Sequence, residues 1–236
     1  MLLLAMSCLQ SRTQDAAFDE LARHDVDGLQ LTPGNLPSPG FRARIAGFDG
    51  TTRLHHGFAW ELYRQRVYDG CGNLQLREPG RSVHPPRALP HAGAEPSVAD
   101  PVAWLRGVAP CDPLLETMYP GYVLGCGAEL ELAMDLGVRL AVDVSHLHLQ
   151  RTAGVLSSAV ERRLREYSRV EEIHVSANDG RSDRHALLQR DTPGLDWARA
   201  RLGDLPVVLE SYWHRLGFDE QRRQLDLLRG GGVAHR

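Results

Sequence analysis

The chain contains no lysine, so all 27 of its basic residues are arginines. This absence excludes several kinds of site at once: the P-loop of nucleotide-binding proteins, Schiff-base and pyridoxal phosphate lysines, and the active site of protein kinases. The chain has 30 acidic residues and a net charge of -3. Proteins that bind nucleic acid usually carry a basic surface, so we expect no nucleic-acid partner.

Cysteine is scarce, and the four cysteines (Cys8, Cys71, Cys111 and Cys126) show no CxxC spacing. A disulfide framework is unusual in a chain of this length, so we expect reduced thiols and a cytoplasmic protein. No apolar run is long enough to span a membrane, and the apolar start of the chain lacks the basic segment of a signal peptide. We therefore expect no membrane partner. The oligomeric state stays open.

Short apolar runs alternate with amphipathic stretches along the whole chain, which is typical of a parallel α/β sheet. We expect strands at residues 2–8, 28–31, 51–56, 82–84, 114–116, 139–144, 170–175 and 205–209. We expect helices at residues 15–24, 127–136, 155–167 and 219–228, and a partly helical segment at residues 187–202.

Eight such units of about 30 residues fill the chain, so residues 1–236 are predicted to form one (β/α)8 barrel, also called a TIM barrel. A doubly wound open sheet is the alternative, but no Gly-x-Gly-x-x-Gly follows a predicted strand. We expect residues 71–96 to form irregular loops over one face of the barrel. Residues 229–236 are predicted to be a flexible tail.

Histidines and carboxylates recur where predicted strands end. In a (β/α)8 barrel these ends meet on one face, called here the mouth, where active sites are built. Six consecutive strands end in such a residue, and a loop adds two more. The nine candidate metal ligands are His56, His84, Glu116, Asp143, His146, His174, Asp183, His185 and Glu210. The coincidence at six successive strand ends favours a metal site over separate structural roles.

Imidazole and carboxylate groups together suit zinc, manganese and iron. One ion needs only three or four protein ligands, so nine candidates predict two or three ions bridged by carboxylates. His55 and His56 alternate faces in a regular strand, so at most one of them is a ligand. We choose His56, which directly precedes Gly57, although the sequence leaves the choice open.

The ordered set of candidates resembles the xylose isomerase-like TIM-barrel superfamily, and most closely its endonuclease IV branch. The matching elements are His56, His84-Pro85, Glu116, Asp143-Val-Ser-His146, His174, Asp183-Arg184-His185 and Glu210, in unbroken order. The resemblance implies a (β/α)8 barrel with up to three metal ions. Simple sugar isomerases of this superfamily use a subset, which here is Glu116, Asp143, His174 and Glu210.

Two segments also resemble multinuclear non-haem iron-dependent oxidases, which modify peptides and small molecules. These are the segment from Asp143 to Leu149 and the segment Ile173-His174-Val-Ser-Ala. This resemblance implies iron. It agrees better with the net charge of -3 than a DNA repair enzyme does.

Three reactions stay open. The first and favoured one is an oxidase-type reaction on a peptide or small metabolite, with iron. The second is metal-dependent hydrolysis of a phosphoester with zinc or manganese, and the third is isomerisation or epimerisation of a sugar or keto-acid. Glu116, Asp143 and Glu210 are the predicted catalytic carboxylates. Arg181, Arg184 and Tyr212 are the predicted substrate-binding residues.

Overall fold

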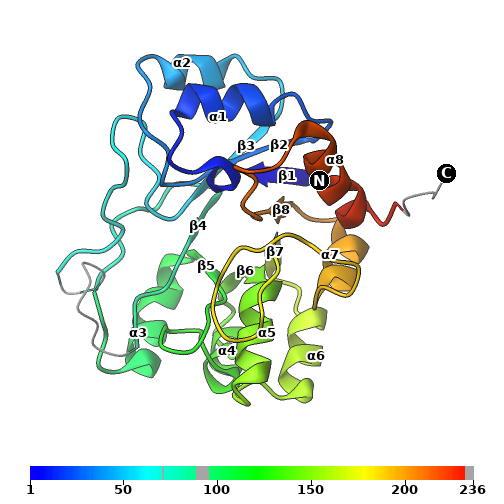
Figure 1. Ribbon diagram of the computed structural model, residues 1–236. Coiled ribbons are helices and arrows are strands. Elements are labelled where there is room, and N and C mark those ends of the chain that lie inside the picture. Colours follow the sequence, from blue (N-terminus) through cyan, green and yellow to red (C-terminus); the bar gives the residue numbers. More distant parts are fainter. Residues whose placement is uncertain (71, 89–95, 232–236) are drawn as a thin grey trace.

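A computed structural model describes residues 1–70, 72–88 and 96–231. Its centre is a closed barrel of eight parallel strands that follow one another in sequence order, and the last strand pairs with the first (Figure 1). The strands are β1 (Leu2–Ala5), β2 (Gly28–Leu31), β3 (Thr51–His55), β4 (Arg81–Val83), β5 (Leu114–Glu116), β6 (Arg139–Asp143), β7 (Val170–Val175) and β8 (Val207–Leu209). The predicted (β/α)8 barrel is therefore confirmed.

Eight α-helices surround the barrel in the described part of the chain. They are α1 (Gln14–Leu21), α2 (Phe41–Ala46), α3 (Pro101–Val108), α4 (Gly127–Asp135), α5 (Val144–Thr152), α6 (Ser158–Glu166), α7 (Leu195–Arg201) and α8 (Phe218–Arg229). Figure 1 shows α1 and α2 on one side of the barrel and α3 to α6 on the opposite side. Short 3-10 helices cover Met6–Leu9 and Ala109–Cys111.

Three helices, α2, α3 and α5, are absent from the sequence-based prediction. Two of them begin at an ordinary start signal in the sequence. At α3, the Asp100 carboxylate accepts a hydrogen bond from the Ala103 amide at 2.9 Å, and Pro101 occupies the first helical position. At α5, the Asp143 carboxylate accepts hydrogen bonds from the amides of Ser145 and His146. Asp143 thus ends a strand, as predicted, and also begins the next helix.

Several predicted boundaries shift for local reasons. Strand β3 ends at His55 because His56 adopts a positive φ of 38°. Strand β8 begins only at Val207, and the preceding Pro206 has no amide hydrogen for a sheet ladder. The predicted helix at residues 187–202 shortens to α7, which begins after Gly194 with φ 83°. Strand β1 gives way to a 3-10 turn after Ala5, earlier than expected.

The apolar core lies between the strands and the helices, where Leu3, Leu115, Val142 and Ile173 are fully buried. The predicted tail overlaps the end of α8, which reaches Arg229 and is closed by Gly230 in a left-handed conformation. Residues 232–236 of that tail lie outside the described residues. In the described part of the chain, no helix has the length and apolar character that crossing a membrane requires.

The described cysteines, Cys8, Cys111 and Cys126, are free thiols, and Cys71 lies outside the described residues. The predicted irregular stretch at residues 71–96 contains β4. Its residues 71 and 89–95 also lie outside the described part. Between β3 and β4, the described residues 56–70 and 72–80 contain no helix or named strand, and this long connection runs from the mouth back to the start of β4.

Candidate metal centre at the barrel mouth

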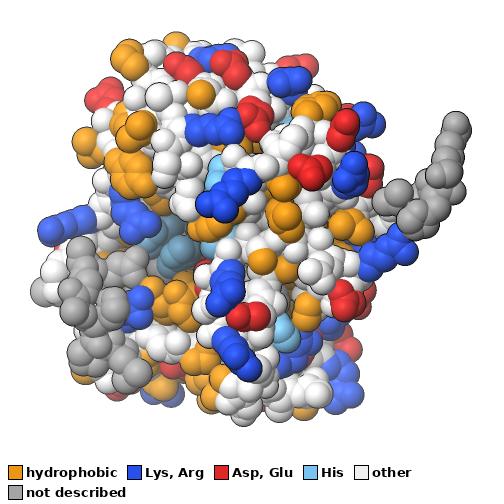
Figure 2. Space-filling view, in the orientation of Figure 1, with side chains coloured by type: hydrophobic (Ala, Val, Ile, Leu, Met, Phe, Trp, Pro, Cys, Tyr) orange, Lys and Arg blue, Asp and Glu red, His pale blue; other side chains and the backbone are white. Residues whose placement is uncertain are grey.

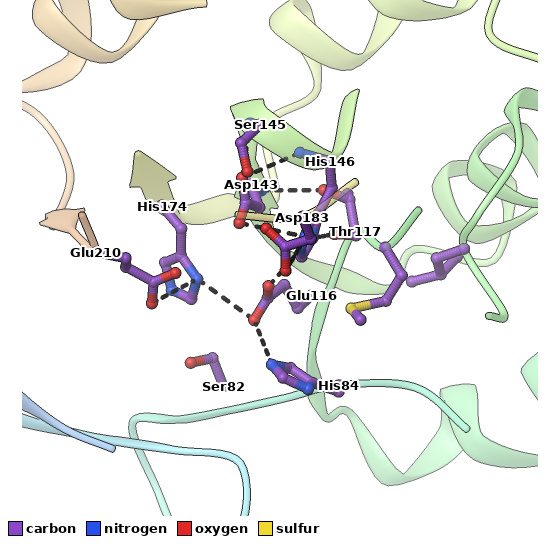
Figure 3. Close-up of polar contacts among 12 residues, drawn as sticks. Ser82, His84, Glu116, Thr117, Asp143, Ser145, His146, His174, Asp183 and Glu210 are labelled. Atoms are coloured by element: carbon purple, nitrogen blue, oxygen red, sulfur yellow. Dashed lines mark hydrogen bonds and ion pairs between the residues drawn. The ribbon is translucent and has the colours of Figure 1, made fainter. Parts of the chain in front are cut away.

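The strand ends bring most of the predicted ligands into one cluster (Figure 3). Glu116 and Asp143 are the last residues of β5 and β6, and His174 lies one residue before the end of β7. Glu210 directly follows β8, and His84 directly follows β4. Glu116, Asp143, His174 and Glu210 are at most 4% exposed. Such burial of acids and imidazoles requires either mutual pairing or a bound cation.

Glu116 lies at the centre of the cluster. Its Oε2 is 3.4 Å from His84 Nε2, 3.6 Å from His55 Nε2 and 3.3 Å from His174 Nδ1. Its Oε1 is 3.4 Å from His146 Nδ1. The two oxygens of one carboxylate therefore reach imidazoles from four different segments of the chain.

His55 and His56 occupy different positions, as the alternation of a strand requires. His55 points into the cluster: its Nε2 is 2.9 Å from His84 Nε2, and its Nδ1 is 2.9 Å from Ser82 Oγ. The ring of His56 instead stacks on the ring of His84, with centroids 4.2 Å apart, and His56 Nδ1 accepts a hydrogen bond from the His84 amide. The structure thus brings His55 among the possible ligands, whereas our choice of His56 stays a prediction.

Asp143 divides its two carboxylate oxygens between two tasks. Oδ1 caps α5, at 2.7 Å from the Ser145 amide and 3.2 Å from the His146 amide. Oδ2 remains on the side of the cluster, 3.5 Å from His146 Nδ1. Helix capping and a place in the candidate centre are therefore compatible for this residue.

His146 lies in the first turn of α5, and the backbone fixes the orientation of its ring. Its Nδ1 is 2.8 Å from the Thr117 carbonyl oxygen, so Nδ1–H is the donor and Nε2 faces the mouth. Nε2 is 3.2 Å from Asp183 Oδ2. The same carboxylate oxygen is 3.3 Å from His185 Nε2. These three residues form a second, more open group, since Asp183 and His185 have side-chain exposures of 18% and 20%.

A buried polar network holds His174 from below. Its Nε2 donates a hydrogen bond to Glu172 Oε1 at 2.6 Å. Glu172 also accepts a hydrogen bond from Gln30 Nε2 at 2.7 Å, and its second oxygen pairs with Arg53. Since Nε2 is engaged in this way, Nδ1 faces Glu116 and Glu210, at 3.3 and 3.5 Å.

The predicted substrate-binding residues differ in their surroundings. The ring of Tyr212 packs against His185, with centroids 4.9 Å apart, and so borders the cluster. Arg184 binds its own loop, through Ser182 Oγ at 3.0 Å and Asp179 Oδ2 at 3.4 Å. The Arg181 side chain is exposed, and its amide donates to Asp179. Their roles toward a substrate stay predictions.

Burial and crowding shift the pKa values of the cluster in opposite directions. Burial, together with the charge of Glu116, raises the pKa of Glu210 to about 7. Burial alone would also raise the pKa of Glu116, but the imidazoles of His84 and His174 outweigh it and hold that pKa well below its ordinary value. Asp183 raises the pKa of His185 to about 9 against the effect of burial. Without a metal ion, protons shared with imidazoles balance these acids.

Several polar atoms of the cluster have no hydrogen-bond partner among the described residues, although they are buried. They are Glu116 Oε2, Asp143 Oδ2, His174 Nδ1, His185 Nδ1 and Asp183 Oδ1. Three sets of three residues each have ligand atoms within 4.8 Å of one another: His55, Glu116 and His174; Glu116, Asp143 and His146; and Asp143, His174 and Glu210. Unpaired oxygen and nitrogen atoms that converge from several strands could serve as ligands for one or more cations.

The sequence left the choice between His55 and His56 open, and Glu172 was missed altogether. The alternation of side chains in a strand is the signal that could have found Glu172. His174 points inward, so Glu172, two residues earlier in β7, must share its face, and Glu171 must face the other way. Glu171 indeed pairs with Arg139, at 2.6 Å. Strand β3 ends at His55, so the direction of the His55 side chain follows the alternation of the strand, whereas that of His56 does not.

Comparisons with known proteins do not identify a family for the chain. No protein-family model matches the chain, and no curated protein matches it. Among solved structures, the chain is similar to the TTHB071 protein from Thermus thermophilus, in a structure soaked with ZnCl2. The sequence identity is 18%, the match covers 99% of this chain and 98% of that chain, and the TM-score is 0.41.

Proposed function

We propose that the protein is a metal-dependent enzyme with a multinuclear centre at the barrel mouth. The observation that supports this best is the position of Glu116, whose two oxygens face imidazoles from four chain segments. A carboxylate in this position suits the bridging of two ions. The unpaired buried atoms around it support the same proposal.

We group the candidate ligands by their contacts into three sets, each of which would suit one ion. The first set is His55, His84 and Glu116, in which the two histidine Nε2 atoms face each other at 2.9 Å. The second is Glu116, Asp143, His174 and Glu210. The third is His146, Asp183 and His185. Glu116 belongs to two sets, and ions bridged by a carboxylate lie about 3.5–4 Å apart in other two-metal sites.

For the reaction we propose an oxidase-type modification of a peptide or small metabolite, with iron as the metal. Iron bound by nitrogen and oxygen ligands would supply oxygen activation. The ligand sets contain five histidines besides the carboxylates, which suits iron, and the net charge of -3 gives little attraction for a nucleic-acid substrate. Tyr212 lies beside the third set, where it can contact a substrate.

Hydrolysis of a phosphoester with zinc or manganese is the second candidate. The third set favours it, because His146, Asp183 and His185 include the partly exposed members that a water or phosphate group reaches first. A simple isomerase needs only Glu116, Asp143, His174 and Glu210. That hypothesis leaves the close contacts of His84 and of the third set without a role, so we rank it last.

Elemental analysis of protein purified without oxygen tests the proposal. We expect two or three iron ions per chain and an absorption band that changes on exposure to air. Oxygen consumption with candidate peptides and small metabolites then tests the reaction class. Stoichiometric zinc together with phosphoester hydrolysis would replace the oxidase proposal with the hydrolase. Metal-free protein that does not take up any of these ions would refute the metal centre itself.

A further inference from the structure

A polar layer lies inside the barrel, directly below the candidate ligands. Its members are the inward-facing residues Gln30 of β2, Arg53 of β3, Ser82 of β4 and Glu172 of β7. In most (β/α)8 barrels, branched apolar side chains fill this interior. Figure 2 shows histidine side chains at the floor of a surface hollow, whereas Gln30, Ser82 and Glu172 are fully buried. Fully buried residues do not contact a substrate, so this layer can act only through the ligands above it.

Ser82 joins the layer to one of the candidate ligands, His55. The two residues are direct partners in the ladder between β3 and β4, and Ser82 Oγ lies 2.9 Å from His55 Nδ1. The same oxygen lies 3.4 Å from Gln30 Nε2. Against the effect of burial, hydrogen bonds from His174 and from Ser82 lower the pKa of the Glu172 carboxyl group. Three polar side chains therefore converge on one hydroxyl group.

The direction of each hydrogen bond follows from what each group can donate. Glu172 pairs with Arg53 through one oxygen, and its carboxylate can only accept. Ser82 has a single proton, which it donates to Glu172. The Ser82 oxygen then accepts from His55, which places the His55 proton on Nδ1 and the free electron pair on Nε2. Nε2 is the nitrogen that lies 3.6 Å from Glu116 Oε2, on the side of the cluster.

Glu172 acts on His174 in the same way, but without an intermediate. Its Oε1 accepts the hydrogen bond from His174 Nε2 at 2.6 Å. In both rings the other nitrogen faces Glu116 Oε2, at 3.6 Å from His55 and 3.3 Å from His174. A metal ion binds an imidazole nitrogen only when that nitrogen carries no proton. One buried carboxylate therefore supports histidines of two ligand sets, and it reaches one of them through Ser82.

We propose that Ser82 is a positioning residue for the candidate metal centre: its hydroxyl relays the support of Glu172 to His55 and so presents His55 Nε2 to the first ligand set. The role in metal binding rests on the proposed metal-dependent function. The position of the His55 proton does not. Carboxylates often support ligating histidines directly, and here a serine extends that support to a second ring.

Removing the hydroxyl group should reverse the position of the proton on His55. Its Nδ1 would lose the acceptor at 2.9 Å, whereas Nε2 would keep Glu116 Oε2 and His84 Nε2 beside it. The proton should therefore move to Nε2, where it competes with a metal ion.

The test is nitrogen NMR of the full, metal-depleted chain with isotope-labelled histidine, in the wild type and in Ser82→Ala. The His55 signals are those that disappear in His55→Gln. Burial holds the pKa of His55 well below its ordinary value, so at neutral pH the ring is neutral and its one proton can be located. We expect this proton on Nδ1 in the wild type and on Nε2 in Ser82→Ala.

Two further variants separate the relay from a general loss of structure. Ser82→Thr keeps a hydroxyl group and should restore the wild-type proton position. Ser38→Ala is the matched control, because Ser38 is also buried and its hydroxyl accepts a hydrogen bond from the Asp15 amide at 3.1 Å, outside the cluster. If Ser82→Thr does not fold, the comparison of Ser82→Ala with Ser38→Ala still decides the proposal.

Zinc titration against a chromophoric chelator measures the consequence for metal binding. Ser82→Ala should weaken the binding of one ion by about tenfold, and Ser38→Ala should bind zinc as the wild type does. The same proton position in the wild type and in Ser82→Ala would overturn the relay, and a shifted proton with unchanged zinc affinity would overturn the positioning role. A shifted proton in a chain whose wild type takes up no zinc would confirm the relay and count against the metal centre instead.

Discussion

Glu172 lies directly beneath His174 on the same strand, and its Oε1 accepts a hydrogen bond from His174 Nε2 at 2.6 Å. This bond turns the opposite nitrogen, Nδ1, toward Glu116 and Glu210. A carboxylate behind a ligating histidine fixes the ring and raises its basicity toward a metal ion. Gln30 and Arg53 in turn hold Glu172, so the orientation of the ring depends on three strands of the barrel.

Glu172→Gln should therefore weaken metal binding at the set of Glu116, Asp143, His174 and Glu210. We expect a loss of about 10-fold to 100-fold in affinity, which is usual when such a carboxylate partner is removed. Competition with a chromophoric chelator measures it. Glu171→Gln is the matched control, because this neighbour has the same charge but pairs with Arg139 on the opposite face of the strand. Equal affinities in the two variants would contradict the positioning role.

The three ligand sets predict separable losses of metal. His185→Ala and His146→Ala should lower the metal content by about one ion per chain, because each removes one member of the third set. Glu210→Ala should affect the second set, and Glu116→Ala should affect two sets at once. Elemental analysis of each folded variant, with the exposed His214→Ala as control, measures the loss. Wild-type metal content in His146→Ala and Glu210→Ala would contradict the ligand assignment.

Replacing His55 and replacing His56 should have different effects on the metal content. His55→Ala removes an Nε2 that lies 2.9 Å from His84 Nε2, so it should lower the metal content by about one ion. His56→Ala removes a ring that stacks on His84, so it should lower the affinity less and leave the stoichiometry intact. Metal titration of both variants decides between them. The reverse result would favour His56 as the ligand, as the sequence analysis predicts.

Removing the metal should destabilise the fold. The buried acids and imidazoles must otherwise pair among themselves, and an ion that binds only the folded chain adds about 2.7 kcal/mol of stability at one hundred times its dissociation constant. For a chain of this size that corresponds to a rise of about 5–10 °C in Tm. Thermal unfolding with chelator and then with excess metal tests this expectation. A Tm independent of metal would speak against binding at the cluster.

His24, which lies outside the candidate metal centre, should make the free energy of unfolding depend on pH. Burial lowers the pKa of His24, and its Nε2 lies 2.9 Å from Gln221 Oε1. The unfolded chain then binds more protons than the folded one below the ordinary histidine pKa of about 6.5. Stability should therefore be lost as the pH falls through 6.5 towards the lowered value. In His24→Gln the free energy of unfolding should fall less steeply with falling pH over this range. Denaturant titration at several pH values measures it. An equal pH dependence in the wild type and the variant would refute the expectation.

Periodicity and turn residues predicted the barrel well, because most of its strands are short apolar runs between breakers. The same reasoning placed Glu116, Asp143, His174 and Glu210 at the mouth, since the ends of parallel strands converge. It could not decide between His55 and His56, because the end of β3 depends on the backbone at His56, which adopts φ 38°. Alternation in β7 places Glu172 on the same face as His174, but its supporting role depends on Gln30 and Arg53, which lie far away in the sequence.

The positive φ values of His56 (38°) and His185 (45°) affect more than the ends of their segments. A residue with a side chain in the left-handed region costs about 1 kcal/mol or more relative to glycine. Both residues border the cluster, so the chain gives up folding free energy at the site where its chemistry is proposed. Glycine at either position would relieve the backbone strain but would also remove an imidazole that contacts the cluster, so the strain is a cost of placing these imidazoles there.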